Sequence, residues 1–230
     1  MARFLVTGAA GFIGAQVCAE LLRRGEAVVG VDNLNDAYDP RLKEWRLARL
    51  QVQEGFTFLR LDIADATAVQ ILPGHGPFDA VFNLAARAGV RASVRAPALY
   101  VQANMVGALN MLELSRAQGI PKFVQASTSS LYGAHNPRPF HEQADISRPL
   151  SPYAATKGGA EMLCHSFHAL HGLDVSILRY FTVYGPAGRP EMSIFRFVQW
   201  VEEGRPIVLY GDGSQQRDFT YIDDIVSGTL

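Results

Sequence analysis

A glycine-rich turn near the N-terminus constrains the fold of this chain more than any other feature. Strand-like residues 3–7 lead into glycines within residues 8–14, and a helical pattern follows directly. Glycines allow a tight strand-to-helix turn and let the backbone approach a pyrophosphate, which the free N–H groups at the helix N-terminus attract. The turn therefore predicts a dinucleotide-binding βαβ unit. The residues expected against the dinucleotide are Gly8, Gly11, Phe12, Ile13 and Gly14.

Short apolar or β-branched runs alternate with longer segments of helical periodicity along the next part of the chain. This alternation is typical of repeated βαβ units and a parallel sheet. Strands are predicted at residues 3–6, 27–31, 57–61, 80–84, 122–127 and 175–179. Helices are predicted at 13–24, 42–53, 98–118 and 153–171. The pattern predicts an α/β fold of the Rossmann type, with a doubly wound parallel sheet.

The chain changes character after residue 179. Prolines and glycines cluster at 185–190, and a helix-like segment at 193–203, a short apolar segment at 207–210 and a glycine turn at 211–213 follow. We therefore predict two parts. Residues 1–179 form the dinucleotide-binding Rossmann domain, and residues 180–230 form a small, incomplete C-terminal substrate region.

The composition favours a compact protein that acts on small molecules. Hydrophobic residues make up 48% of the 230, and the formal net charge of -1 gives no field that would attract nucleic acid or an anionic membrane. No charged leader precedes the first strand, and no apolar run approaches the roughly 20 residues of a membrane-spanning helix. Cys18 and Cys164 lie in apolar helical patterns, so we expect reduced thiols, no metal site and a cytoplasmic location.

A carboxylate after the second predicted strand marks the ribose end of the dinucleotide site. Asp32 lies eighteen residues past Gly14, where its oxygens can accept hydrogen bonds from both ribose hydroxyls. It would repel a 2′-phosphate, and no arginine follows it in residues 33–35, so the spacing favours NAD over NADP. A simple glycine turn with a helix-capping aspartate is the alternative interpretation.

Tyr153 and Lys157, four residues apart, carry the predicted acid-base chemistry. Pro152 favours a helix start, so both side chains project from one helix face. A free tyrosine, with a pKa of about 10, is a poor base near neutrality, but an ammonium group and the positive nicotinamide would stabilise its phenolate. The hydroxyl run at 127–130 ends the predicted fifth strand, at the sheet edge where α/β folds bind ligands. Taken alone, the Tyr153–Lys157 pair would be compatible with an ordinary helix surface. The hydroxyl run at 127–130 would be compatible with a solvated turn.

Together these motifs resemble the NAD-dependent nucleotide-sugar epimerases of the extended short-chain dehydrogenase/reductase family, over essentially the whole chain. The strings at 32–36, 88–91 and 181–190 are most similar to epimerases that act at C4 of UDP-glucuronate or UDP-glucose. The resemblance implies a UDP-sugar substrate and a tightly bound NAD that takes hydride from C4 and returns it to the other face of a transient 4-keto sugar. It also implies a homodimer with a four-helix interface, built from the helices at 98–118 and 153–171.

The resemblance further implies roles for individual residues. Thr128 would relay the proton between Tyr153 and the sugar O4, with Lys157 as electrostatic support. Additional cofactor positions would be Asn33, Asn35, Asp62, Ile63, Leu84, Ala85, Ala86 and Phe181, with Asn104 behind them. Substrate positions would be Ser129, Ser130, Thr182, Arg189 and Arg217, of which Arg217 would grip the diphosphate.

Several other functions are compatible with parts of this pattern. Sugar-nucleotide dehydratases of the family carry an acidic pair where this chain has Ser129 and Ser130, and UDP-xylose-forming decarboxylases carry a glutamate at the second position. Both positions therefore favour an epimerase. Relatives continue for roughly another hundred residues, within the size of a single larger domain. A non-catalytic NAD-binding remnant, a nucleotide-sugar dehydratase and a small-alcohol dehydrogenase are retained as alternatives.

Overall fold

The computed structural model describes residues 1–209 and 211–230, in which six parallel strands form the central sheet. The strand order is β3-β2-β1-β4-β5-β6, with every neighbouring pair parallel. The strands are β1 (Arg3–Thr7), β2 (Ala27–Asp32), β3 (Phe56–Arg60), β4 (Ala80–Asn83), β5 (Lys122–Thr128) and β6 (Asp174–Tyr180). This order reverses direction at β1 and β4, which is where open α/β sheets leave a crevice for a ligand.

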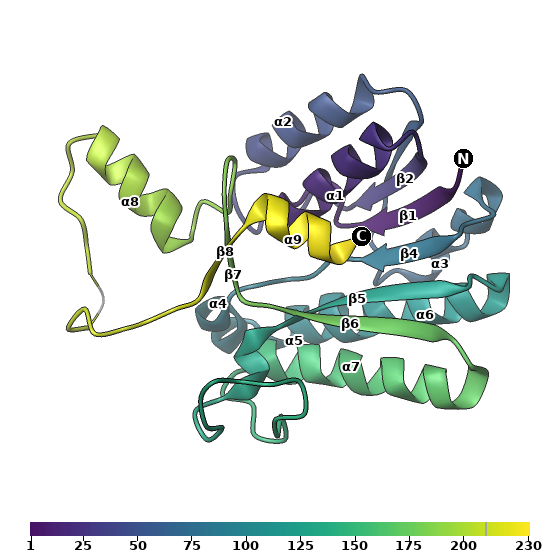
Figure 1. The fold of residues 1–230 in the computed structure, drawn as a ribbon. Helices are drawn as coiled ribbons and strands as arrows, with labels where there is room; N and C mark the ends of the chain where they lie inside the picture. The colour runs from purple at the N-terminus through teal and green to yellow at the C-terminus, as the bar shows by residue number, and fades with distance from the viewer. Residues whose placement is uncertain (210) are drawn as a thin grey trace.

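Helices cover both faces of the sheet (Figure 1). Those before residue 120 are α1 (Phe12–Arg23), α2 (Pro40–Gln51), α3 (Ala66–Val69), α4 (Val90–Arg95), α5 (Pro97–Tyr100) and α6 (Gly107–Gln118). Those after it are α7 (Pro152–His171), α8 (Ser193–Glu202) and α9 (Ile222–Thr229). No helix within residues 1–209 and 211–230 has both the length and the apolar character needed to cross a membrane.

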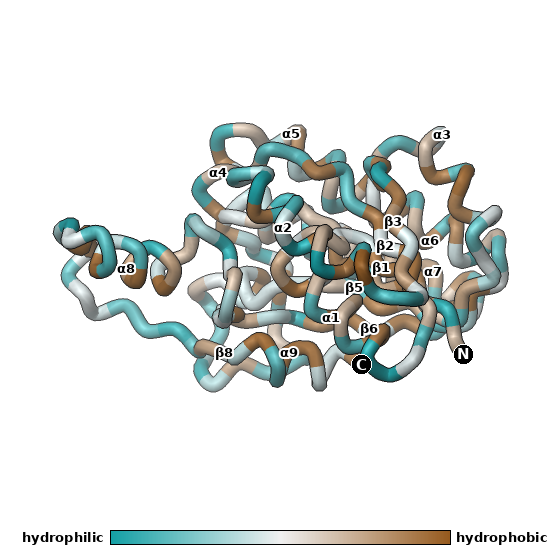
Figure 2. Tube along the Cα trace, turned by 90° about the horizontal axis from the view of Figure 1, so that it is seen from above, coloured by the Kyte–Doolittle hydropathy of each residue, from teal (hydrophilic) through white to brown (hydrophobic). Residues whose placement is uncertain are grey.

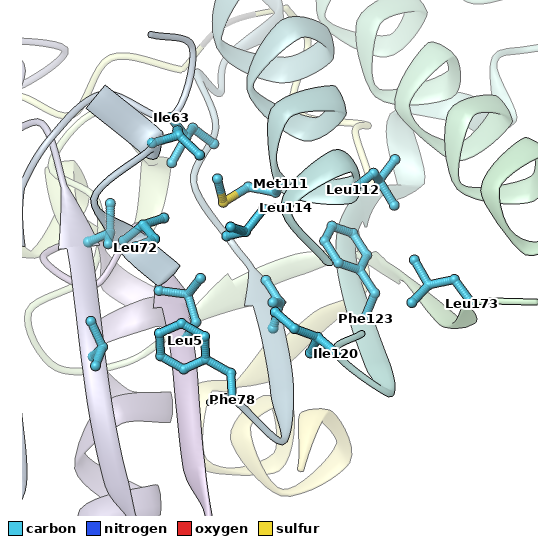
Figure 3. Close-up of a cluster of buried hydrophobic side chains, with 14 of the residues drawn as sticks. Leu5, Ile63, Leu72, Phe78, Met111, Leu112, Leu114, Ile120, Phe123 and Leu173 are labelled. Atoms are coloured by element: carbon cyan, nitrogen blue, oxygen red, sulfur yellow. The ribbon is translucent and has the colours of Figure 1, made fainter. Parts of the chain in front are cut away.

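Each face of the sheet has its own hydrophobic core, because successive strand residues point to opposite sides. Leu5 and Phe123 face α3, α6 and α7, where Figure 3 shows them among side chains such as Met111. The next residues along the same two strands, Val6 and Val124, belong to the other core with α1 and α9. The near-continuous apolar strands thus reflect burial on both faces.

The predicted α/β fold is confirmed. All six predicted strands are present, with ends shifted by at most one residue, and helices α1, α2 and α7 match their predicted ranges to within two residues. The helix predicted at 98–118 is present without a break from 97 to 118, but its residues Val101–Val106 are π-helical and separate α5 from α6. A π-turn widens the helix, and here it carries Asn104, whose side chain bonds to the backbone of Arg87 and to Thr156 Oγ1.

The chain after residue 180 forms a second small sheet and two helices. Strands β7 (Thr182–Tyr184) and β8 (Phe219–Tyr221) pair in parallel, and α8 stands away from the rest of the molecule (Figures 1 and 2). Helix α9 instead packs against α1, with Ile222 and Val226 in the second core. Residues 207–209 of the predicted apolar segment have no regular secondary structure, and Tyr210 lies outside the described residues. The division into 1–179 and 180–230 stays a prediction.

Candidate active site

A cleft with a volume of about 480 Å³ follows the carboxyl ends of the parallel strands. Parallel strands bring their following turns to one sheet edge, so residues far apart in sequence meet there. The predicted cofactor residues on its wall are Gly8, Gly11, Phe12, Ile13, Gly14, Asp32, Asn33, Asn35, Asp62, Ile63, Leu84, Ala85, Ala86 and Phe181. The predicted catalytic and substrate residues on it are Thr128, Ser129, Ser130, Tyr153, Lys157, Thr182, Arg189 and Arg217. Only Asn104 of the predicted set lies behind the wall.

The glycine turn is too tight for side chains at all three of its glycines, Gly8, Gly11 and Gly14. A Cβ at Gly14 would lie 2.1 Å from the Gly8 carbonyl oxygen, and one at Gly8 would lie 2.9 Å from Ala85 Cα. Gly8 also has a φ of +72°, which favours glycine. Gly11 then caps α1 without a side-chain hydrogen bond, so the helix N-terminus opens into the cleft. This cradle fits the pyrophosphate of NAD.

Asp32 ends β2 as a buried carboxylate with several partners. Its Oδ2 accepts a hydrogen bond from the Ala10 N–H at 3.2 Å, and its Oδ1 accepts one from the Leu34 N–H at 2.8 Å. Lys43, a buried lysine on α2, lies with Nζ 3.3 Å from Asp32 Oδ1 and from Asn35 Oδ1. Lys43 was not predicted from the sequence, because a cation on the following helix gives no signal at residues 33–35. The ammonium offsets part of the Asp32 charge.

The end of the cleft next to Asp32 joins the turns after β2 and β3. Asn33 Nδ2 donates to Asp62 Oδ2 at 2.8 Å, and Asn35 Nδ2 donates to Asn33 Oδ1 at 2.7 Å. Asp62 also accepts from the Ala64 N–H at 2.9 Å. These bonds hold the two turns together without the help of a ligand, so this end is largely pre-formed.

The predicted reacting residues come from β5 and α7. Thr128 is the last residue of β5, and its Oγ1 accepts from the Ser130 N–H at 3.2 Å. Ser151 caps α7 by accepting from the Ala154 N–H at 3.1 Å, which places Tyr153 in the first turn. The Tyr153 ring lies edge-on to the Tyr100 ring, with centroids 6.2 Å apart. Thr128, Tyr153 and Lys157 therefore face one cleft from two fixed elements.

Lys157 is buried, with 2% of its surface exposed. Burial lowers its pKa to about 8, against the opposing effects of Cys164 and Glu161. Desolvation penalises the ammonium form in the folded protein. The site therefore holds a cation that is costly to keep charged, and a negative charge placed next to it in the cleft would lower that cost.

The pH dependence of stability should report this buried ammonium. Between pH 8 and pH 10.5, the unfolded chain keeps the Lys157 proton and the folded protein releases it, so the penalty that this group places on folding is relieved by about 3 kcal/mol as pH rises through the window. Cys164, whose pKa burial raises to about 12, acts in the opposite direction once the unfolded thiol ionises.

Urea unfolding of wild type and of Lys157→Met, at both ends of this pH window, measures the free energy of unfolding. The difference between the two proteins isolates the contribution of Lys157. A Lys122→Met control removes a partly exposed lysine and should retain the wild-type slope. Parallel pH curves for wild type and Lys157→Met would contradict the expectation.

A buried polar network behind the reacting residues was not predicted. Glu161 accepts from Ser127 Oγ at 2.5 Å, and the Arg179 guanidinium grips it through Nε at 3.0 Å and Nη2 at 2.8 Å. Arg179 also lies over the Tyr132 ring, 5.3 Å from its centroid. The network ties α7, β5 and β6 together next to Thr128. The sequence feature that could have indicated this network is Glu161, a carboxylate that lies one turn beyond Lys157 on α7.

The predicted substrate residues are less tightly assembled. Arg189 pairs with Glu191, through Nε to Oε1 at 2.8 Å, and both line the cleft. Thr182 is fixed through its backbone, whose N–H donates to the Asp218 carbonyl at 3.2 Å. Arg217 is exposed and donates from Nη1 to the neighbouring Gln216 carbonyl. The cofactor half of the cleft thus has more internal hydrogen bonds than the substrate half.

Comparison with known proteins gives one consistent result. The model of the family described as "NAD dependent epimerase/dehydratase family" matches residues 4–230. A UDP-glucuronate 4-epimerase of Thermodesulfobacterium geofontis is 56% identical over 230 residues, which are all of this chain and 71% of that protein.

Two solved structures extend this similarity to three dimensions. The UDP-glucuronic acid 4-epimerase of Bacillus cereus, in complex with UDP-glucuronic acid and NAD, has a TM-score of 0.91 and 40% identity, over 99% of this chain and 71% of that one. A UDP-glucose 4-epimerase of Thermotoga maritima with UDP-glucose has a TM-score of 0.89 and 33% identity, over 99% and 72% of the two chains.

Proposed function

This chain belongs to the NAD dependent epimerase/dehydratase family, and from that premise we propose that it inverts C4 of UDP-glucuronate with an NAD that stays bound. The resemblance noted in the sequence is thereby confirmed at the family level. One observation carries the proposal: Thr128, Tyr153 and Lys157 line the same cleft as the glycine turn and Asp32. The 56% identity to a UDP-glucuronate 4-epimerase supports the choice of substrate.

The proposed chemistry divides between the cofactor and the protein. Bound NAD would accept hydride from C4 and return it to the opposite face of the flat 4-keto sugar. Tyr153 would accept the O4 proton through the Thr128 hydroxyl and give it back when the hydride returns, because a positioned base must also act as the acid on the reverse step. Lys157, held charged near this tyrosine, would stabilise the phenolate. The cycle has no net oxidation.

The preference for a carboxylated sugar rests on Arg189. Its guanidinium already pairs with a carboxylate, that of Glu191, inside the cleft. A uronate carboxylate could take that place and accept from the same two nitrogens of Arg189, Nε and Nη2. We assign Ser129, Ser130 and Thr182 to the sugar and Arg217 to the diphosphate on the basis of the family resemblance.

Product analysis of three substrates tests the proposal. Purified protein is incubated separately with UDP-glucuronate, UDP-glucose and UDP-galactose, without added NAD, and the 4-epimers are quantified by chromatography. We expect UDP-galacturonate from the first, and little or no epimer from the other two, because neither has a carboxylate for Arg189. Absence of any epimer would overturn the proposal.

The other outcomes distinguish the alternatives. NAD bound without turnover would favour the non-catalytic remnant, and net oxidation that requires added NAD would favour the small-alcohol dehydrogenase. Loss of water from the sugar would favour a dehydratase.

We further propose that the protein forms a homodimer through α6, α7 and the segment before α6. Large apolar side chains are exposed there, including Leu99 at 49%, Val101 at 42% and Met162 at 58%. Such a patch is typical of an interface. Light scattering should give twice the chain mass for wild type and a reduced mass for Met162→Glu, and a monomeric wild type would exclude the interface.

A cytoplasmic location stays a prediction, with which the free, buried thiols of Cys18 and Cys164 are compatible.

A further inference from the structure

Arg46 is a buried arginine that joins the cofactor turn to the loop on the sugar side. It lies on α2 with 4% of its surface exposed. Its Nη1 donates to the Ala10 carbonyl at 3.1 Å and to Tyr38 Oη at 2.6 Å. Its Nη2 donates to the Ala187 carbonyl at 2.6 Å and to the Gly188 carbonyl at 3.4 Å. One guanidinium thus connects two segments that lie at opposite ends of the sequence.

This arrangement is costly for a purely structural contact. Arg46 Nε is the one buried side-chain nitrogen or oxygen, among the described residues, that has no hydrogen-bond partner. A buried donor without a partner and a buried charge both oppose folding. A planar guanidinium with donors fixed on two sides, however, holds two carbonyl groups in one set geometry, which the freely rotating ammonium of a lysine does not.

Both ends of the fork contact backbone that matters for the proposed reaction. Ala10 belongs to the glycine turn, and its N–H donates to Asp32 Oδ2 at 3.2 Å. Ala187 has a φ of +54°, a left-handed conformation that a residue with a Cβ holds only where its surroundings fix it. It precedes Arg189 by two residues. Arg46 therefore fixes the loop that carries Arg189, and it does so from the cofactor turn.

We propose that Arg46 couples the cofactor site to the sugar site. NAD on the glycine turn and at Asp32 would fix Ala10, and Ala10 would fix Arg46. Arg46 in turn would hold loop 185–191 in the docked position, in which Arg189 faces the cleft. Without that contact, the loop would occupy a released position more often. Because coupling between two ligands is reciprocal, the sugar would also tighten the cofactor. Arg46 does not line the cleft, so it is a positioning residue, and the proposal rests on the proposed function above.

Amide hydrogen exchange tests the coupling without any substrate. The protein is stripped of cofactor, refilled with NAD, and compared by mass spectrometry as wild type, Arg46→Lys and Arg46→Met. In wild type, NAD should slow exchange both at residues 8–14 and at residues 185–192. In the Arg46 variants, NAD should slow exchange at 8–14 only. Arg49→Lys is the matched control, since Arg49 lies on the same helix but is exposed over the Trp45 ring, and it should behave as wild type. Equal protection of 185–192 in wild type and both Arg46 variants would overturn the proposal.

Calorimetric titration with UDP-glucuronate measures the same coupling as an affinity ratio. In wild type, NAD should increase the affinity for the sugar by about fivefold or more, which is the lower end of typical coupling between sites. In Arg46→Lys this ratio should fall toward one, because the affinity of the NAD-loaded protein for the sugar should fall more than that of the empty protein. An unchanged ratio would overturn the proposal. If wild type binds NAD but no UDP-glucuronate, the proposed substrate is wrong, and the exchange experiment still decides the role of Arg46.

Discussion

Replacement of Tyr153 by phenylalanine should reduce epimerisation by about 10²- to 10⁴-fold and leave NAD bound. The change removes the phenol oxygen to which we assign the roles of base and acid, exchanging the O4 proton through Thr128, and positioned acid-base groups typically contribute this much to a rate. The ring that packs edge-on against Tyr100 is kept, so the first turn of α7 should keep its structure. Turnover of UDP-glucuronate and the NAD content of the purified variant are the two measurements.

A second tyrosine provides the control for this experiment. Tyr184 lies on β7, is 37% exposed and does not line the cleft, so Tyr184→Phe should retain the wild-type rate. An unchanged rate in Tyr153→Phe would remove this tyrosine from the mechanism. Loss of bound NAD together with activity would mean that the tyrosine holds the cofactor instead of transferring the proton.

The sheet and the cofactor turn could be predicted because their signals are local. Strands such as β1 and β2 are buried on both faces and read as short apolar runs, and the steric limits at Gly8 and Gly14 require glycine itself. The edge at which the ligand residues meet follows from parallel strand direction alone. For these reasons the strand ranges and most of the cleft wall followed from the sequence.

The buried cations of α2 could not be predicted, because their partners lie on other segments of the chain. On α2 a helical pattern assigns Lys43 and Arg46 to a solvated surface, yet both are buried against groups on other segments. The π-helical segment could not be predicted for the same reason. Its residue Asn104 is held by hydrogen bonds to Arg87 and Thr156, which both lie outside its own helix. Such contacts override local propensity and become visible only in the folded chain.

Glu161 shows how a residue behind the cleft fixes the reacting groups. Its partners Ser127 and Arg179 lie on β5 and β6, and Lys157 precedes it by one turn of α7. The Ser127 hydrogen bond sets the position of α7 against the end of β5, where Thr128 lies, and the ion pair with Arg179 ties α7 to β6. Charge also matters, because Glu161 is one of the groups that oppose the lowering of the Lys157 pKa.

Replacement of Glu161 by alanine should lower the free energy of unfolding by about 3 kcal/mol. Removal of one partner from a buried ion pair leaves the other charge uncompensated, which typically costs 3–5 kcal/mol, and we take the lower end because the Arg179 side chain is 17% exposed. Urea unfolding near neutral pH measures the change. Glu113→Ala is the matched control, since Glu113 and Arg116 form a pair that is about half exposed, and the loss there should stay below about 1 kcal/mol.

The double variant distinguishes a missing partner from a missing side chain. If the penalty in Glu161→Ala comes from the uncompensated Arg179 charge, Glu161→Ala combined with Arg179→Ala should be less destabilised than the sum of the two single changes. Strict additivity would contradict the ion-pair explanation and would leave lost packing as the cause. Because the network supports Thr128 and Lys157 without lining the reacting centre itself, epimerisation in the double variant should fall through a slower turnover more than through a weaker affinity for the sugar.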